Sequence, residues 1–225
     1  MNGTSIVIAA RNPGQLLAEA LASVAAQTLP PSSVVVVDDG STDGAVPSLT
    51  AAFPDITVIQ QGPLGRSAAR NRGAAATDSQ NLLFLDADDL LRPSALEALE
   101  AVLEASPDLE MVHGGVFEFV DRRNPPPPGV RHTDTEVRVR LGGSTLLRRT
   151  LWERVGPMDE RIPRGEWIDW VGRATHLGAR TAEIDEVVLD RRLHSSNSAS
   201  PGDVDTHYLA VIRSAIRRKR EEVEP

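Results

Sequence analysis

The sequence contains no cysteine, which excludes a disulfide scaffold, a zinc–cysteine module and a thiol nucleophile. Aromatic residues are few, with three Trp, one Tyr and four Phe, and this argues against a surface that stacks the bases of a single strand. The formal net charge is −8, whereas a broad nucleic-acid surface requires excess positive charge. We therefore expect no nucleic-acid partner. A phosphate ligand would have to be held locally, by a metal ion or a few arginines.

Long apolar runs are also missing, since no stretch of about 18 residues could cross a membrane. We therefore expect no integral membrane segment. Residues 1–4 lack a basic region and lead directly into a strand-like segment, which is not the pattern of a signal peptide. These observations together favour a cytoplasmic protein.

The first 105 residues alternate short apolar runs with segments of helical periodicity. The runs predict strands at 5–10, 34–37, 56–60 and 82–85, and the intervening segments predict helices at 14–27, 44–53, 65–77 and 93–105. Regular alternation of this kind predicts an α/β fold with a mostly parallel sheet flanked by helices.

The second part of the chain is less regular. It predicts strands at 111–120, 142–148 and 187–191, helices near 149–155 and 165–177, a proline-rich loop at 121–136 and a serine-rich stretch at 195–203. Residues 204–221 have the pattern of an amphipathic helix. We expect a single domain with two halves, 1–105 and a smaller acceptor-side half at 106–203, followed by a C-terminal helical tail at 204–225.

Two predicted strands end in acidic clusters, and open α/β sheets bind ligands at this edge. In the segment Asp86-Ala87-Asp88, an extended backbone would point both carboxylates the same way, so they would repel each other unless a cation lay between them. Oxygen ligands suit Mg²⁺ or Mn²⁺. The alternative is a solvated turn in which Asp89 caps the next helix. Asp39, at the end of the second strand, could similarly cap a helix or accept a hydrogen bond from a base or a ribose.

The strings SIVIAARN, VVVVDDGSTD, GRSAARNRGAA and LLFLDADD, in this order and spacing, resemble the N-terminal half of family 2 glycosyltransferases with the GT-A (Rossmann-like) fold. The resemblance covers residues 4–105 and continues more loosely to about residue 198. It implies an inverting, metal-dependent transferase that moves a hexose-type sugar from a nucleotide-diphosphate sugar, most often a UDP-sugar. It also implies Mn²⁺ or Mg²⁺ as the cofactor.

The resemblance assigns roles to individual residues. The nucleotide-sugar contacts of the family map onto Ala9, Ala10, Arg11, Asp39, Arg70, Asp86 and Ala87. Among these, Asp39 would bind the uracil, Arg70 would face the nucleotide and the donor sugar, and Asp86 would contact the ribose or the metal. Asp88 would bind the metal directly.

Residues 165–173, GEWIDWVGR, depart from the pattern G-E-D-W-x-x-W-x-R, in which the aspartate is the general base. Trp167 takes the place of that aspartate and cannot accept a proton. Glu166 and Asp169 are three residues apart, so they share a helix face. We expect Asp169 to be the base, because many relatives also carry an aspartate two places after the usual one. Glu166 is the other candidate, and either carboxylate could instead form a salt bridge within its helix.

Near the end of the match, Arg192 and His194 resemble a late family segment of the form R-x-H-x-x-N. Alternation in an extended segment would put both on one side. The resemblance makes His194 a third metal ligand or a diphosphate contact and gives Arg192 to the nucleotide-sugar site. A solvated histidine in a serine-rich loop is the alternative.

The acceptor would offer a hydroxyl or thiol on a peptide, a glycan or a small molecule, and the protein could form a homodimer. Two other functions stay open. A non-catalytic nucleotide-sugar-binding module is compatible with the displaced base. A sugar-nucleotide nucleotidyltransferase would need a glycine-rich basic loop after the first strand, where this chain has AARNPG.

Overall fold

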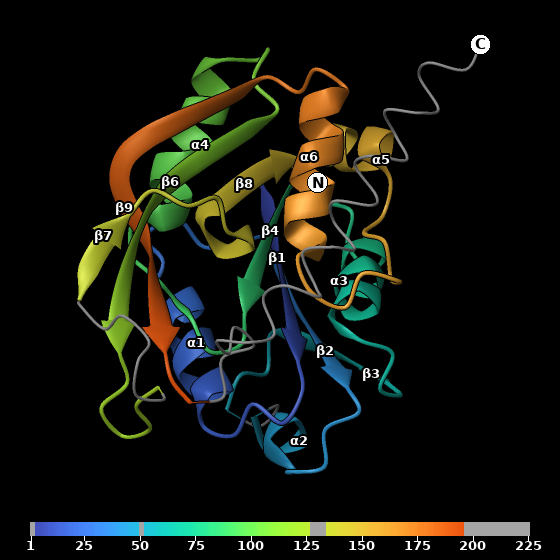
Figure 1. Ribbon diagram of the computed structural model, residues 1–225, viewed down its shortest axis with the longest axis vertical. Coiled ribbons are helices and arrows are strands. Elements are labelled where there is room, and N and C mark those ends of the chain that lie inside the picture. Colours follow the sequence, from blue (N-terminus) through green and yellow to red (C-terminus); the bar gives the residue numbers. More distant parts are fainter. Residues whose placement is uncertain (1–2, 50–51, 127–133, 196–225) are drawn as a thin grey trace.

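One curled sheet with helices on both faces runs through the computed structural model, which describes residues 3–49, 52–126 and 134–195 (Figure 1). The first elements are β1 (Thr4–Ala10), α1 (Leu16–Ala25), β2 (Ser33–Asp39), α2 (Ala45–Leu49), β3 (Ile56–Gln61), α3 (Arg66–Ala75), β4 (Asn81–Asp86), β5 (Leu90–Leu91) and α4 (Ala95–Ala105). The later ones are β6 (Met111–Val120), β7 (Thr135–Val137), the 3₁₀ helix η1 (Gly142–Ser144), β8 (Thr145–Arg148), α5 (Arg149–Val155), α6 (Glu166–His176) and β9 (Thr181–Leu193).

The strand order is β3-β2-β1-β4-β8-β6-β9-β5, with β7 paired to β6. β1 to β4 of the first half are parallel, as the alternating sequence predicts. Their register aligns the strand ends, because Ala10 lies opposite Asp38 and Ala9 lies opposite Asp86. The acidic ends of β2 and β4 therefore meet at one edge of the sheet.

The second half makes the sheet mixed. β8 is antiparallel to both β4 and β6, whereas β9 is parallel to β6. The mostly parallel arrangement thus describes the first half. β9 begins six residues before the predicted strand, and its last part pairs with the short strand β5, where Leu90 lies opposite Asp190. This pairing brings the end of β9 to the residues that follow β4.

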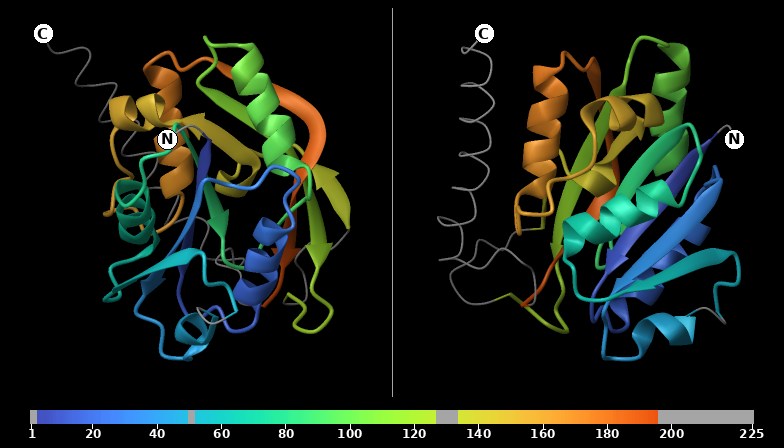
Figure 2. Two further views of the ribbon diagram at one scale, coloured as in Figure 1. Left: turned by 180° about the vertical axis from the view of Figure 1, so that it is seen from behind. Right: turned by 90° about the vertical axis from the view of Figure 1, so that its right-hand side faces the viewer.

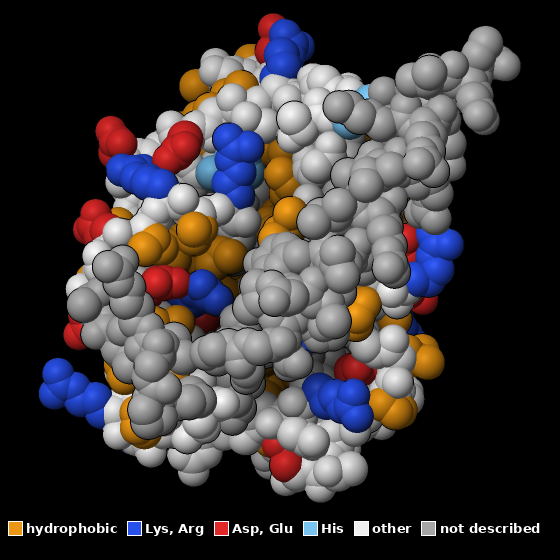
Figure 3. Space-filling model, viewed as in Figure 1, with side chains coloured by type: hydrophobic (Ala, Val, Ile, Leu, Met, Phe, Trp, Pro, Cys, Tyr) orange, Lys and Arg blue, Asp and Glu red, His pale blue; other side chains and the backbone are white. Residues whose placement is uncertain are grey.

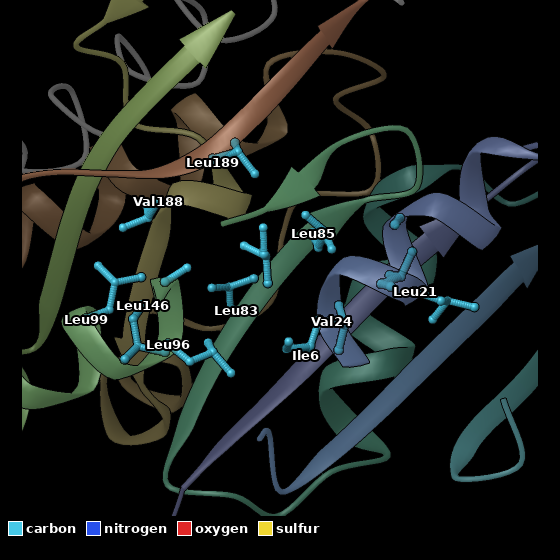
Figure 4. Packing of buried hydrophobic residues seen from close by; sticks show 14 of the residues in the cluster. Ile6, Leu21, Val24, Leu83, Leu85, Leu96, Leu99, Leu146, Val188 and Leu189 are labelled. Carbon is cyan, nitrogen blue, oxygen red and sulfur yellow. The ribbon is translucent and has the colours of Figure 1, made fainter. Parts of the chain in front are cut away.

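Alternate side chains of the central strands pack on opposite faces of the sheet. On one face, α1 and α4 cover Ile6, Leu83 and Leu85 (Figure 4). On the other face, α3, α5 and α6 cover the sheet (Figure 2), and a set of aromatic rings packs there: Phe84, Trp152, Trp167 and Trp170. Both faces of β4 are buried, which explains its uninterrupted apolar run.

Two predictions lie wholly or largely outside the described residues: the tail at 204–225 and the serine-rich stretch after residue 195. Within the described part of the chain, no helix is long and apolar enough to span a bilayer.

His113 is a buried histidine in β6. Its Nδ1 atom lies 2.8 Å from Thr145 Oγ1, and its buried Nε2 atom has no hydrogen-bond partner among the described residues. Burial, with a smaller contribution from Arg140, lowers the pKa of His113 from 6.5 to about 4. The imidazole is therefore neutral in the folded protein at neutral pH.

This buried imidazole predicts a loss of stability in mild acid. Between pH 6.5 and 4 the unfolded chain binds a proton at His113 that the folded protein does not, so stability falls as the pH falls. From pH 7 to pH 5 we expect a loss of about 2 kcal/mol from this group. Urea unfolding at both pH values should show a smaller loss in His113→Gln. Equal losses in both proteins would contradict this assignment.

Candidate active site

A cavity of about 730 Å³ lies at the edge where the strand ends meet, a volume typical of small-molecule sites. Eight residues expected at the site line it: Ala9, Ala10, Arg11, Asp39, Asp86, Ala87, Asp88 and His194. The walls carry charges of both signs. On the face of the molecule seen in Figure 3, acidic and basic side chains also lie side by side in a hollow next to a hydrophobic patch. The cavity therefore brings together residues from β1, β2, β4 and the segment after β9.

Asp39 is one of the residues that line the cavity. Its carboxylate accepts hydrogen bonds from the Gln61 side-chain amide at 2.8 Å and from the backbone N–H groups of Leu64 at 2.8 Å and Gly65 at 2.9 Å. Gly65 has a φ of 100°, which glycine adopts without strain, and precedes α3. Asp39 thus fixes the start of α3 while its side chain borders the cavity.

The loop after β1 is hydrogen-bonded to the loop after β2, which begins next to Asp39. The N–H of Asn12 donates to Ser41 Oγ at 2.9 Å, and the Asn12 side-chain oxygen accepts from the N–H of Thr42 at 2.7 Å. The N–H of Gly14 donates to Asp43 at 2.9 Å. Asn12 has a φ of 48°, a conformation that asparagine tolerates better than most residues. These bonds hold the wall formed by residues 9–11.

The acidic cluster consists of Asp86, Asp88 and Asp89, which each offer a carboxylate oxygen within 4.8 Å of the others. His194, 106 positions away from Asp88, comes to its carboxylate, with His194 Nε2 at 2.9 Å from Asp88 Oδ2. Burial, followed by the charges of Asp88 and Asp86, raises the pKa of Asp89 well above its usual value. The sequence alone suggested Asp89 only as a helix cap.

This donor set fits a hard divalent cation. Carboxylate oxygens are ligands suited to Mn²⁺ or Mg²⁺, and an imidazole nitrogen is a common ligand of first-row transition metals. Repulsion among the carboxylates, which contributes to the raised pKa of Asp89, is the effect that a bound cation would remove. The residues present therefore fit the metal that the family resemblance implies.

Arg70 in α3 joins the acidic cluster to α6. Its Nη2 atom donates to Asp86 Oδ1 at 2.6 Å and its Nη1 atom donates to Glu166 Oε1 at 2.7 Å. Burial raises the pKa of Asp86, but the charges of Arg70 and Arg66 outweigh it and keep that pKa below its usual value. Arg70 is buried and is not among the residues lining the cavity, so its direct contact with a donor stays a prediction.

The two candidate bases on α6 have different surroundings. Glu166, 3% exposed, pairs with Arg70 and lies 3.7 Å from Nη1 of Arg66, which lines the cavity. Asp169, 1% exposed, accepts from Arg173 Nε at 3.0 Å. Arg173 also donates to the backbone carbonyls of Val155, the last residue of α5, and of Pro157. Neither carboxylate lines the cavity, but Glu166 is next to a residue that does.

Arg192 is also buried rather than exposed to the cavity.

Several cavity residues were missing from the sequence interpretation: Glu19, Arg66, Asp121, Arg123, Asn124 and Arg164. Three of them lie in the loop after β6 that the proline run marked as unusual. Glu19 and Arg66 lie on ordinary helices, and no local pattern distinguishes them.

Asp121 and Arg123 form part of an ion-pair network on the cavity wall. Arg123 donates to Glu19 at 2.8 Å and to Asp121 at 3.1 Å. Hydrogen bonding from Arg123 lowers the pKa of Asp121 to about 2. This wall stays ionised across the neutral pH range.

The sequence is similar to those of known glycosyltransferases. The family model for glycosyl transferase family 2 matches residues 5–156, more than half of the chain. An uncharacterized glycosyltransferase of Nostoc sp., alr2836, is 30% identical over 212 residues, covering 86% of this chain and 66% of that protein. An uncharacterized glycosyltransferase of Haemophilus influenzae is 29% identical over 236 residues, covering 94% of this chain and 79% of that protein.

Among solved structures, S. aureus TarS 1-349 in complex with UDP-GlcNAc has a TM-score of 0.72 at 20% identity, covering 94% of this chain and 64% of that one. The chain thus spans slightly less than two thirds of TarS 1-349 and of the Nostoc relative. The structural likeness shows the GT-A fold expected from the sequence. With the family model matched through both the strand-end acidic clusters and β8, the chain belongs to glycosyl transferase family 2.

Proposed function

We propose that this chain is an inverting, metal-dependent glycosyltransferase that takes a hexose-type sugar from a UDP-sugar. One observation carries the proposal: Asp86 and Asp88 of the acidic cluster, with His194, share a single cavity with Asp39 and residues 9–11. A nucleotide, its diphosphate and the attached sugar need contiguous sites of this kind. The solved complexes of TarS with UDP and with UDP-GlcNAc support UDP as the nucleotide.

In this proposal, Asp39 and residues 9–11 receive the nucleoside. Asp86, Asp88, Asp89 and His194 would hold Mn²⁺ or Mg²⁺. A cation bound there would stabilise the negative charge of the departing nucleoside diphosphate. Arg66, on the same cavity wall, adds a fixed positive charge near that group.

We assign the general base to Glu166, which reverses the order expected from the sequence. Its carboxylate is linked through Arg70 to Asp86 and lies beside the cavity residue Arg66. Asp169 is instead engaged by Arg173 within α6. The acceptor would lose its proton to Glu166 as its oxygen or sulfur attacks the anomeric carbon, and the carbon–oxygen bond to the diphosphate would break. That acceptor group belongs to a peptide, a glycan or a small molecule.

A nucleotide screen tests the proposal. Thermal unfolding would be followed with UDP-GlcNAc, UDP-glucose, GDP-mannose and dTDP-glucose, each with Mn²⁺ or with EDTA. We expect stabilisation by UDP-sugars that EDTA removes, and release of UDP detected by mass spectrometry. Binding without UDP release, even with mixed candidate acceptors, would favour the non-catalytic module. Absence of any metal-dependent stabilisation would contradict the proposal.

A further inference from the structure

Arg192, near the end of β9, contacts two members of the acidic cluster while remaining 2% exposed. Its guanidinium Nε donates to the backbone carbonyl oxygen of Asp88 at 2.9 Å. Its own backbone N–H donates to Asp89 Oδ1 at 2.9 Å. One residue therefore holds the main chain at one cluster member and the carboxylate of the next.

The rest of the guanidinium is anchored away from the cluster. Nη2 donates to Glu19 Oε2 at 2.5 Å, and Nη1 lies 3.3 Å from Asp121 Oδ2. The group also lies over the ring of Phe119, 5.0 Å from its centroid. Two carboxylates already compensate its charge, so the guanidinium is suited to hold protein groups in place rather than to bind a diphosphate.

The same strand end delivers His194 to Asp88. Because β5 pairs with the end of β9, the residues between β4 and β5, which include Asp88 and Asp89, lie beside the strand end that leads to His194. The end of β9 therefore positions all three residues. Arginine suits this task because its planar group donates in several fixed directions at once. Lysine in the same place could supply the charge, but its donors share one nitrogen and could not reach the three separate groups that Nε, Nη1 and Nη2 of Arg192 contact.

We propose that Arg192 is a positioning residue that holds Asp88 and Asp89 in the arrangement needed to bind the divalent cation. This inference rests on the proposed function, because it requires that the acidic cluster binds a metal. It gives Arg192 a different role from the direct nucleotide-sugar contact expected from the sequence.

Metal binding to the free protein tests this role. Mn²⁺ alone would be titrated into the protein while free Mn²⁺ is followed by electron paramagnetic resonance. We expect Arg192→Gln and Arg192→Lys to weaken Mn²⁺ binding by about tenfold or more, the usual cost of removing a partner that orients metal ligands. With UDP release as the readout, Arg192→Lys should raise the Mn²⁺ concentration needed for half activity, while the rate at saturating Mn²⁺ stays within about threefold of wild type.

Arg191→Gln is the matched control. Arg191 carries the same charge close to the cluster, but its Nη1 atom pairs with Glu118 at 2.7 Å. Loss of this charge should change Mn²⁺ affinity by less than about threefold, since no bond to a metal ligand is removed. A loss equal to that of Arg192→Gln would mean that net charge, not positioning, sets the affinity, and would overturn the inference.

A second variant keeps the test valid if substitution of Arg192 disturbs folding. The Glu19 side chain is 35% exposed, and Glu19→Gln removes a charged anchor of the guanidinium without touching the cluster. We expect Mn²⁺ binding weakened about threefold to tenfold with thermal unfolding in EDTA close to wild type. Wild-type affinity in Glu19→Gln and in every folded Arg192 variant would overturn the inference. Failure of the wild-type protein itself to bind Mn²⁺ would instead overturn the proposed function on which it depends.

Discussion

Asp88→Asn should remove the Mn²⁺-dependent stabilisation of this protein by UDP-sugars and reduce UDP release to background. Asp88 is a member of the acidic cluster, lies on the cavity wall and contacts His194. The amide keeps the size of the side chain but loses the charge that binds a hard cation. Because partners that only orient metal ligands contribute about 10- to 100-fold in affinity, loss of a ligand should cost about 100-fold or more.

Although Asp88→Asn should abolish metal-dependent stabilisation, it should not lower the stability of the metal-free protein. In the metal-free protein the charge of Asp88 raises the pKa of Asp89, which reflects repulsion within the cluster. Removal of that charge should leave the metal-free variant at least as stable as wild type in thermal unfolding with EDTA. A variant that binds Mn²⁺ and UDP-sugar normally would contradict the assigned site.

Asp190→Asn is the matched control for this substitution. Asp190 is an acidic residue on β9, opposite Leu90 in β5, and its carboxylate pairs with Arg92 at 2.8 Å. It removes one negative charge from the same region without removing a member of the cluster. Its Mn²⁺ affinity and UDP release should stay close to wild type, so a loss confined to Asp88→Asn identifies ligation rather than net charge as the cause.

The first half of the fold could be predicted because its signals are local. Each buried strand is a continuous apolar run, and each acidic cluster follows such a run directly. Strand direction in the second half depends on how the chain returns to the sheet, which no local pattern encodes. The two-residue strand β5 exists because it pairs with the end of β9, and the early start of β9 exists because it pairs with β6. The sequence of either segment alone therefore does not reveal them.

In the candidate site, too, residues with local sequence signals were predictable and contacts made by packing were not. Asp86, Asp88 and His194 were predicted together, and the structure brings them to one cavity. Partners of charged residues were not predictable, because Arg70 reaches Glu166 across 96 positions and Arg192 reaches Glu19 across 173. Such pairings arise only when helices and strands pack. They decide whether a charged side chain is exposed to the cavity or compensated inside the protein.

Glu166→Gln should reduce UDP release and sugar transfer while leaving binding of UDP and Mn²⁺ close to wild type. The glutamine amide can still accept a hydrogen bond from Arg70, but it cannot take a proton. Loss of a general base typically costs about 100- to 10,000-fold in rate. Steady-state measurement of UDP release from UDP-sugar, with and without acceptor, should therefore show a fall in kcat and little change in donor affinity.

Asp169→Asn separates the two carboxylates of α6. Asp169 accepts from Arg173, which also connects α6 to the backbone at the end of α5. Weakening this charged hydrogen bond should cost about 2 kcal/mol of stability or less, measured by urea unfolding. Turnover per folded molecule should remain within a few fold of wild type.

The two variants together distinguish a base from a structural charge, because they predict opposite patterns. Glu166→Gln should lower kcat with little loss of nucleotide affinity, whereas Asp169→Asn should lower stability with little loss of kcat. The reverse pattern would restore Asp169 as the base and leave Glu166 as the residue that compensates Arg70. Severe loss of kcat in both would mean that Asp169 acts on the reaction through the placement of α6, since its carboxylate is 1% exposed and held by Arg173. In that case Asp169→Glu, which keeps the charge, should recover more activity than Asp169→Asn.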